Sequence, residues 1–176
     1  GQQTATVPRR GEAAAANPTK TAQRIGVRRA PVTSDPTAVA ETVLGALWYN
    51  VFATNDAVAT LSGQPFDNHD RIYTGSANDL LLNLRIERFR ASPSALAAIA
   101  AQYETSGKLK MPMITLHTTG DPVIPYLHEP IYTLKTIAAG TFLKRTNIPV
   151  CAYGHCAFTA QEVFTAFGIM VLRSVP

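Results

Sequence analysis

Hydrophobic residues recur along the first part of the chain at the spacing of helices, with polar residues between them. The clearest case is the segment SDPTAVAETVLGALWYNVFA, which begins at Ser34. Its apolar residues return every three or four positions, so they share one face of a helix. These apolar residues are Val39, Val43, Leu44, Leu47, Trp48, Val51 and Phe52. Ser34 or Asp35 is suited to cap this helix and Pro36 to open it, so the pattern predicts a long amphipathic helix.

Segments on either side extend the helical pattern. NPTKTAQRIG predicts a short helix with Asn17 as N-cap, Pro18 at the first helical position and Gly26 at its end. TNDAVATLSG predicts a short helical turn that continues the long helix and ends near Gly63. Residues 1–16 are basic and rich in alanine, and we expect them to be mobile or weakly helical.

Two more helices are predicted after the loop QPFDNHDRIYTGS. NDLLLNLRIERFR favours a helix from about Asn78 to Arg90. SPSALAAIAAQYETSG favours another, with Ser92 as its cap and Gly107 at its end. Residues 17–107 are therefore expected to consist of helices and loops.

The pattern changes after this region. KLKMPMITLHT is apolar and too short for a helix, so it predicts a buried strand, and TNIPVCAYGH predicts a second one. PYLHEPIYTLKTIAAG predicts a helix that ends at Gly140. FTAQEVFTAFGIMVLR predicts a terminal helix opened by a capping box of Thr159 and Glu162. Strands and helices that alternate with short connections indicate parallel strands, so residues 108–176 are predicted to form an α/β segment.

Composition and charge narrow the classes of function. The chain is 46% hydrophobic and 16% charged, and it has no apolar run near the roughly 18 residues of a membrane span. Residues 1–33 hold six basic residues against Glu12 as their single acid, so the whole of the net positive charge comes from them, but no nucleic-acid-binding motif accompanies them. A solvated basic segment is therefore favoured over nucleic-acid binding. Because the chain starts at Gly1 without a signal-peptide pattern, we expect a processing point or an artificial end there, and a secreted or periplasmic location stays open.

Two cysteines bracket the sequence CAYGHC. Cys151, Cys156 and His155 lack a fourth nearby ligand and would make a poor zinc site. A disulfide across so short a loop requires a sharp reversal of the backbone. The sequence favours free thiols, leaves a disulfide open, and indicates no metal and no other cofactor.

A carboxylate and an imidazole each follow one of the two predicted strands. Asp121 lies in a Gly-Asp-Pro turn after the first strand, and His155 follows the second strand in YGHCAFT. Chemistry in a parallel sheet gathers at the carboxyl ends of the strands, so we expect these side chains to meet. The carboxylate could then fix the imidazole tautomer and stabilise the imidazolium formed in catalysis. Gly154 suits a tight turn that directs the histidine outward. Either residue alone would be typical of a loop, but the pair indicates a catalytic dyad.

Three stretches carry a resemblance to a known family: PFDNHDRIYTGSANDLLLNLRIERF, PMITLHTTGDPVIPYLHEPIY and YGHCAFTAQEVFTAF. From about Phe66 to Leu172 the chain resembles the C-terminal half of an α/β-hydrolase, with the later part of its helical cap before it. The resemblance implies a serine hydrolase that cleaves esters or, less readily, amides of small or peptide-like substrates. It implies a triad in the chain order Ser, Asp, His, with Asp121 as the acid and His155 as the general base. Residues 17–107 would be the cap-like region and residues 108–176 the end of the core.

The nucleophile of such a triad is missing from this sequence. The motif G-x-S-x-G occurs nowhere in the 176 residues. Ser62 and Ser76 lack the strand–elbow–helix setting, and the family's oxyanion-hole loop is absent as well. We therefore expect the serine on an N-terminal half outside this chain, and we expect the chain alone to be inactive. The alternative is a non-catalytic, hydrolase-like protein that pairs with a partner through an open sheet edge.

The predicted strands also suggest a partner. A parallel sheet buries its strands on both faces, which would leave Met113, Ile114, Leu116 and Val150 in need of neighbours. We expect an N-terminal companion fragment or a second copy of the chain to complete the sheet.

Further side chains are candidates for the substrate pocket. Trp48, Tyr49 and Phe52 could line an acyl pocket under the cap, although residues at helical spacing are more typical of a core. His117, within the first predicted strand, either packs in the core or lines the site.

Overall fold

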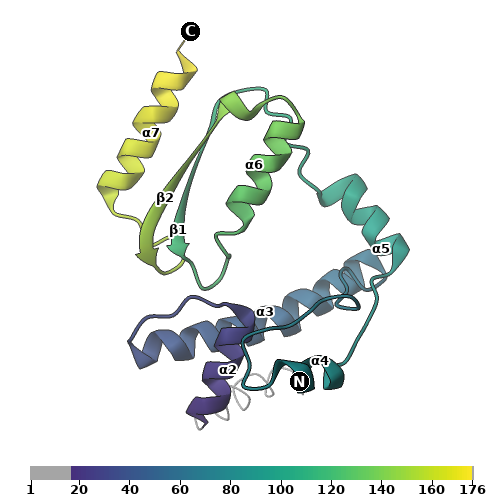
Figure 1. Ribbon diagram of the computed structural model, residues 1–176. Helices are drawn as coiled ribbons and strands as arrows, with labels where there is room; N and C mark the ends of the chain where they lie inside the picture. Colours follow the sequence, from purple (N-terminus) through teal and green to yellow (C-terminus); the bar gives the residue numbers. More distant parts are fainter. Residues whose placement is uncertain (1–16, 176) are drawn as a thin grey trace. The chain divides into compact units, whose positions relative to one another are not determined.

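The computed structural model describes residues 17–175 and is drawn in Figure 1. The chain divides between Glu104 and Thr105 into two compact units, which we call the first unit and the second unit. The segment 1–16, expected to be mobile or weakly helical, lies outside the described residues.

Within residues 17–104, the described part of the first unit, the regular elements are helices. Helix α2 spans Pro18–Arg28, α3 spans Pro36–Leu61, α4 spans Asp79–Arg85 and α5 spans Pro93–Ala98. One turn of π-helix, Ile99–Tyr103, follows α5 directly.

The N-caps of the first two helices are as the sequence predicts, but the predicted end of the first helix at Gly26 is wrong, because α2 continues to Arg28 and Arg29 is its left-handed C-cap. The Asn17 side chain accepts a hydrogen bond from the Lys20 N–H at 3.1 Å, and Asp35 accepts one from the Thr37 N–H at 2.8 Å. Helix α3 continues without interruption to Leu61, so the segment TNDAVATLSG belongs largely to it. The side-chain acceptors satisfy N–H groups that have no partner within the helix, and this fixes where each helix begins.

The prediction of a helix from about Asn78 to Arg90 is wrong in its second half. Helix α4 ends at Arg85, and Ile86 after it has an extended backbone. The Asn68 side chain explains the change, because it donates to the Glu87 carbonyl and accepts from the Phe89 N–H, each at 2.9 Å. These bonds give the backbone a partner outside a helix.

The next helix is also shorter than predicted. Ser92 does not cap α5 with its side chain, and its hydroxyl accepts instead from the Gln64 N–H at 2.9 Å. The helical backbone ends with the π turn at Tyr103. Gly107, predicted as the end of this helix, belongs to the second unit, where its carbonyl accepts from the Thr141 hydroxyl at 2.5 Å.

The second unit alternates strands and helices. Strand β1 spans Met113–Gly120, helix α6 spans His128–Ala138, strand β2 spans Arg145–Tyr153 and helix α7 spans Ala160–Ser174. A single 3-10 turn, Phe142–Lys144, precedes β2. Figure 1 shows the two strands side by side, with α6 and α7 on either side of them.

The parallel pairing expected from the alternation is confirmed. Met113 pairs with Arg145, and the register continues to Thr118 opposite Val150, where it becomes irregular. The capping box at the start of α7 is also present. The second unit thus mixes helices with two parallel strands, which is compatible with the α/β class.

The strand residues expected to need a partner differ in their exposure. Val150 is only 7% exposed and lies opposite the fully buried Thr118, so the expectation is wrong for this residue. Met113, Ile114 and Leu116 are half-buried. Large apolar side chains of the flanking helices are exposed, namely Ile131, Leu134, Ile137, Phe164, Phe167 and Leu172.

No helix within residues 17–175 combines the length and the apolar character that crossing a membrane requires.

Candidate active site

The turn after β1 buries Asp121 and uses one of its two carboxylate oxygens. The residue is 3% exposed. Its Oδ1 accepts hydrogen bonds from the backbone N–H groups of Val123 and Ile124, at 2.8 and 2.9 Å. An aspartate that bonds the backbone two and three residues ahead is typical of such turns. The turn therefore holds the carboxylate and leaves Oδ2 for another partner.

That partner is His155. Its Nδ1 lies 2.8 Å from the Asp121 Oδ2, so the predicted contact is present. The imidazole is 49% exposed, so one edge of the ring meets a buried carboxylate while the rest can be approached from solvent. Because the carboxylate only accepts, Nδ1 must donate, and Nε2 of the neutral ring is then its acceptor nitrogen.

Two glycines bring the strand ends together. The Gly154 N–H donates to the Gly120 carbonyl at 3.2 Å. A Cβ on Gly120 would lie 2.9 Å from the Ala152 carbonyl oxygen, which is too close for any other residue. Gly154 has a φ of +121°, a conformation that side chains rarely adopt, and its carbonyl accepts from the Thr118 hydroxyl at 2.6 Å. The loop before the histidine is thereby tied to β1.

The electrostatics favour the ionised form of the carboxylate. Burial raises the pKa of Asp121, but hydrogen bonds from the Ile124 N–H, the His155 imidazole and the Val123 N–H outweigh it. The net result is a pKa below the ordinary value for aspartate. An ionised carboxylate is the form that can hold and stabilise an imidazolium.

His117 lies beside the Asp121–His155 pair, but its closest partners are the Ile124 carbonyl and Glu129. Its Nε2 is 3.0 Å from the Ile124 carbonyl and 3.6 Å from the Asp121 Oδ2, and its Nδ1 is 3.2 Å from the Glu129 Oε1. The ring also packs edge-on against Tyr126. With a side-chain exposure of 13%, His117 braces the turn from within the unit. Of the two alternatives that the sequence left for His117, packing within the unit therefore fits better than lining the site.

A buried polar network centred on Glu129 anchors α6 to both strands. The carboxylate accepts from the Thr115 hydroxyl at 2.8 Å, from the Asn147 amide at 2.9 Å and from the Arg145 guanidinium. Arg145 also donates to the Thr133 hydroxyl. Paired and hydrogen-bonded, these charges are tolerated in the interior, and they fix the helix that follows the Asp121 turn.

The Cys156 thiol lies on the Nε2 side of the His155 imidazole. Its Sγ lies 3.7 Å from the His155 Nε2, and the residue has a left-handed backbone with φ of +54°. Cys151 and Cys156 are both free, exposed thiols. The sequence interpretation treated the two cysteines alike, and only the adjacency in GHC hinted that Cys156 would reach the ring.

The three aromatic candidates for the pocket lie together in the first unit. The Trp48 ring is 5.1 Å from both the Tyr49 and the Phe52 rings, measured between centroids. Trp48 and Tyr49 are 49% and 45% exposed, so they are not core residues. As residues of α3 they belong to the first unit, whereas the dyad belongs to the second, and their part in a pocket stays a prediction.

Ser62 and Ser76, the two serines considered above as nucleophiles, have structural roles. Ser62 is the left-handed C-cap of α3, and the Ser76 hydroxyl donates to the Asp79 carboxylate at 2.6 Å. Within the described part of the chain, no three His, Cys, Asp or Glu side chains gather as metal ligands would.

Comparisons with protein-family models, with curated proteins and with solved structures find no match to this chain. The geometry of the site therefore carries the functional assignment.

Proposed function

We propose that this chain supplies the acid and the base of a serine hydrolase that cleaves carboxylic esters and, less readily, amides. The observation that carries the proposal is the 2.8 Å contact between His155 Nδ1 and Asp121 Oδ2 at the ends of two parallel strands. The nucleophilic serine would come from a segment outside these 176 residues, because no G-x-S-x-G motif occurs among them.

The two residues would act on an attacking serine in sequence. The His155 Nε2 accepts the hydroxyl proton as the serine oxygen bonds to the acyl carbon, and the imidazolium then gives that proton to the leaving alcohol as the ester bond breaks. Asp121 holds the donating Nδ1 and stabilises the imidazolium. Water repeats these steps to release the acid. Removal of the base in such systems costs about 10² to 10⁴ in rate.

The arrangement of the second unit supports the α/β-hydrolase reading. Two parallel strands joined by α6 end in the acid and the histidine, in the chain order that the family requires. On this proposal, the second unit is the end of the hydrolase core and the helical first unit is cap-like. An N-terminal companion fragment, or a second copy, would add the remaining strands of the sheet.

One observation favours a second candidate, a hydrolase-like interaction protein without catalysis. Among the described residues the sheet has only two strands, and α6 and α7 expose large apolar side chains such as Leu134 and Phe164. An open edge and exposed apolar helices are features that a partner chain can cover.

The gene provides the first test. An in-frame G-x-S-x-G motif upstream of the Gly1 codon supports the hydrolase, whereas a start codon directly before it favours the interaction protein. The longer product is then assayed with p-nitrophenyl acetate. We expect His155→Ala to lower kcat/KM by about 10² to 10⁴. His128→Ala serves as the matched control, because His128 is an exposed histidine of the same unit.

The isolated chain provides the second test. Residues 1–176 alone should show no saturable ester hydrolysis, because even one oxyanion-hole donor is worth about 10² to 10³ in rate and the nucleophile is missing as well. Turnover that a serine-directed phosphonate abolishes in the isolated chain would contradict the proposal. Equal activity of His155→Ala and the longer wild-type product would contradict it too.

A further inference from the structure

The first unit contains a cavity that the proposed catalytic chemistry does not use. It lies between α2 and α3, with a volume of about 290 Å³. Eight residues line it, and they are Arg24, Ile25, Arg28, Ala30, Thr42, Val43, Ala46 and Leu47. This volume is close to the lower end of the roughly 300 to 1,000 Å³ of ligand pockets, which suits a small ligand.

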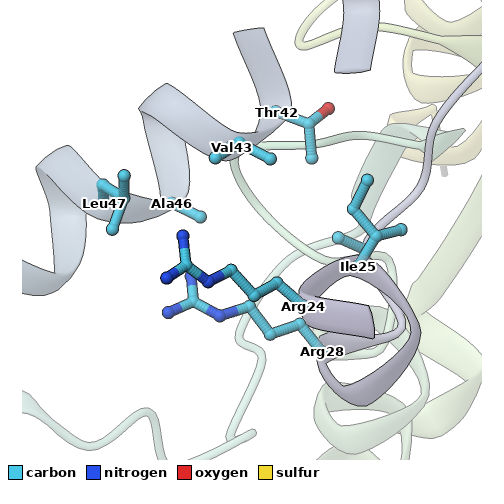
Figure 2. A pocket seen from close by; sticks show the side chains of 8 residues that line it. Arg24, Ile25, Arg28, Thr42, Val43, Ala46 and Leu47 are labelled. Carbon is cyan, nitrogen blue, oxygen red and sulfur yellow. The ribbon is translucent and has the colours of Figure 1, made fainter. Parts of the chain in front are cut away.

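Two arginines share the mouth of this cavity. Arg24 and Arg28 are one helical turn apart on α2, and Figure 2 shows both guanidinium groups extending into the space in front of α3. Within residues 17–175 neither guanidinium has a hydrogen bond or an ion pair. Like charges at this spacing repel each other. The Arg28 side chain is solvent-exposed, and the partial desolvation of its guanidinium, followed by the charge of Arg24, lowers its pKa. The helix dipole favours a cation such as Arg28 in the last turn of α2. It does not explain why the guanidinium groups of Arg24 and Arg28 extend into the same cavity.

The rest of the lining is apolar. Ile25, Val43, Ala46 and Leu47 supply aliphatic side chains, and Val43 is buried. The one neutral polar side chain, that of Thr42, donates its hydroxyl to the Pro31 carbonyl at 3.2 Å. The cavity is thus lined by two planar cationic hydrogen-bond donors, the guanidinium groups, and elsewhere mainly by aliphatic side chains.

We propose that this cavity binds an alkyl carboxylate of medium chain length, such as a fatty acid anion. The carboxylate would lie between the guanidinium groups of Arg24 and Arg28, whose forked N–H donors match its two oxygens. The alkyl chain would lie against Val43, Ala46 and Leu47 on α3. The bound anion replaces the repulsion between the two cations by attraction to both, and the chain removes apolar surface from water.

Isothermal titration calorimetry of the full chain tests the proposal with sodium decanoate below its micelle concentration. The fluorescence of Trp48, the single tryptophan and the neighbour of Leu47, gives an independent signal. We expect saturable one-to-one binding. Acetate, which has the charge without the tail, and decanol, which has the tail without the charge, should each bind at least about tenfold more weakly.

Variants separate the two arginines from general charge effects. Arg24→Gln combined with Arg28→Gln should weaken decanoate binding by about tenfold or more. Arg29→Gln removes the same charge from the next residue, which does not line the cavity, and should stay within about twofold. Ala46→Phe fills the cavity, keeps both arginines and should abolish binding. Circular dichroism melts verify that each variant is folded.

Several results would overturn the proposal. These are absence of binding to the folded wild-type chain, equal weakening by Arg29→Gln and by the double variant, and unchanged binding in Ala46→Phe. Decanol or acetate binding as tightly as decanoate would overturn it as well. None of these results depends on ester hydrolysis, so the cavity and the proposed active site succeed or fail separately.

Discussion

Substitution of Asp121 by two different residues distinguishes the roles of its two oxygens. Alanine removes the acceptor of the Val123 and Ile124 N–H groups together with the partner of the His155 Nδ1. Asparagine keeps the Oδ1 acceptor for both N–H groups. Its amide can then donate to Nδ1 if the imidazole adopts the other tautomer. We expect the turn to survive in the asparagine variant, with the proton of the imidazole moved to Nε2.

The structure sets the size of the two effects. Asp121→Ala leaves two backbone N–H groups without their acceptor beside a residue that is only 3% exposed. Because His155 is half exposed, the main loss is that of the acceptor for these N–H donors, which costs about 1 to 3 kcal/mol of unfolding free energy. Asp121→Asn loses only the charge assistance, which amounts to about 1 kcal/mol.

The difference between wild type and Asp121→Asn should depend on pH. The pKa of the folded-state carboxyl is lowered, below the unfolded value of about 3.9. The stability that this shift contributes is fully present above pH 3.9, and it is lost as the pH falls through the folded pKa. The two unfolding free energies should therefore converge in acid.

Urea denaturation of the full chain, followed by circular dichroism between pH 7 and pH 3, measures these quantities. Nuclear magnetic resonance of the imidazole nitrogens of His155 reports the tautomer. An Asp121→Ala variant within about 0.5 kcal/mol of wild type at pH 7 would refute the reasoning, because such a change is typical of an exposed surface site. So would a wild-type tautomer in the asparagine variant.

Two further predictions concern the neighbours of the dyad. Thr118→Val should cost about 1 to 3 kcal/mol in urea denaturation, because the Gly154 carbonyl loses its buried hydroxyl partner, whereas Thr119→Val, at the next and exposed position, should be nearly neutral. Iodoacetamide should alkylate Cys156 faster than Cys151 in a timed mass-spectrometric assay, because only the former has an imidazole nitrogen 3.7 Å from its sulfur. Equal costs for the two threonines, or equal alkylation rates, would contradict these predictions.

The contacts that sequence reasoning found were those set by short-range pattern and by topology. Asp121 and His155 could be brought together because each directly follows a strand, and parallel strands end at the same edge. The caps at Asn17 and Asp35 were readable because a cap depends on its own helix alone.

The contacts that it missed join positions far apart in the chain. The extended backbone after Arg85 depends on Asn68, whose side chain bonds to Glu87 and Phe89. The pairing of Glu129 with Arg145 depends on the way α6 crosses the strands, which no local pattern specifies. Helix propensity favoured a helix after Arg85, and it carries no information about the Glu129–Arg145 pair. In both places, hydrogen bonds between residues far apart in the chain determine the structure.

The hydrogen bonds that hold the Asp121–His155 pair have a consequence for how such a protein can change. Every partner described for them, from Thr115 and His117 to Asn147, Gly154 and Cys156, lies on one continuous stretch between Met113 and Cys156. Gene recombination exchanges continuous stretches of sequence most easily. The first unit, which ends at Glu104, could thus be exchanged as a whole while the Asp121–His155 pair keeps every hydrogen-bond support described for it.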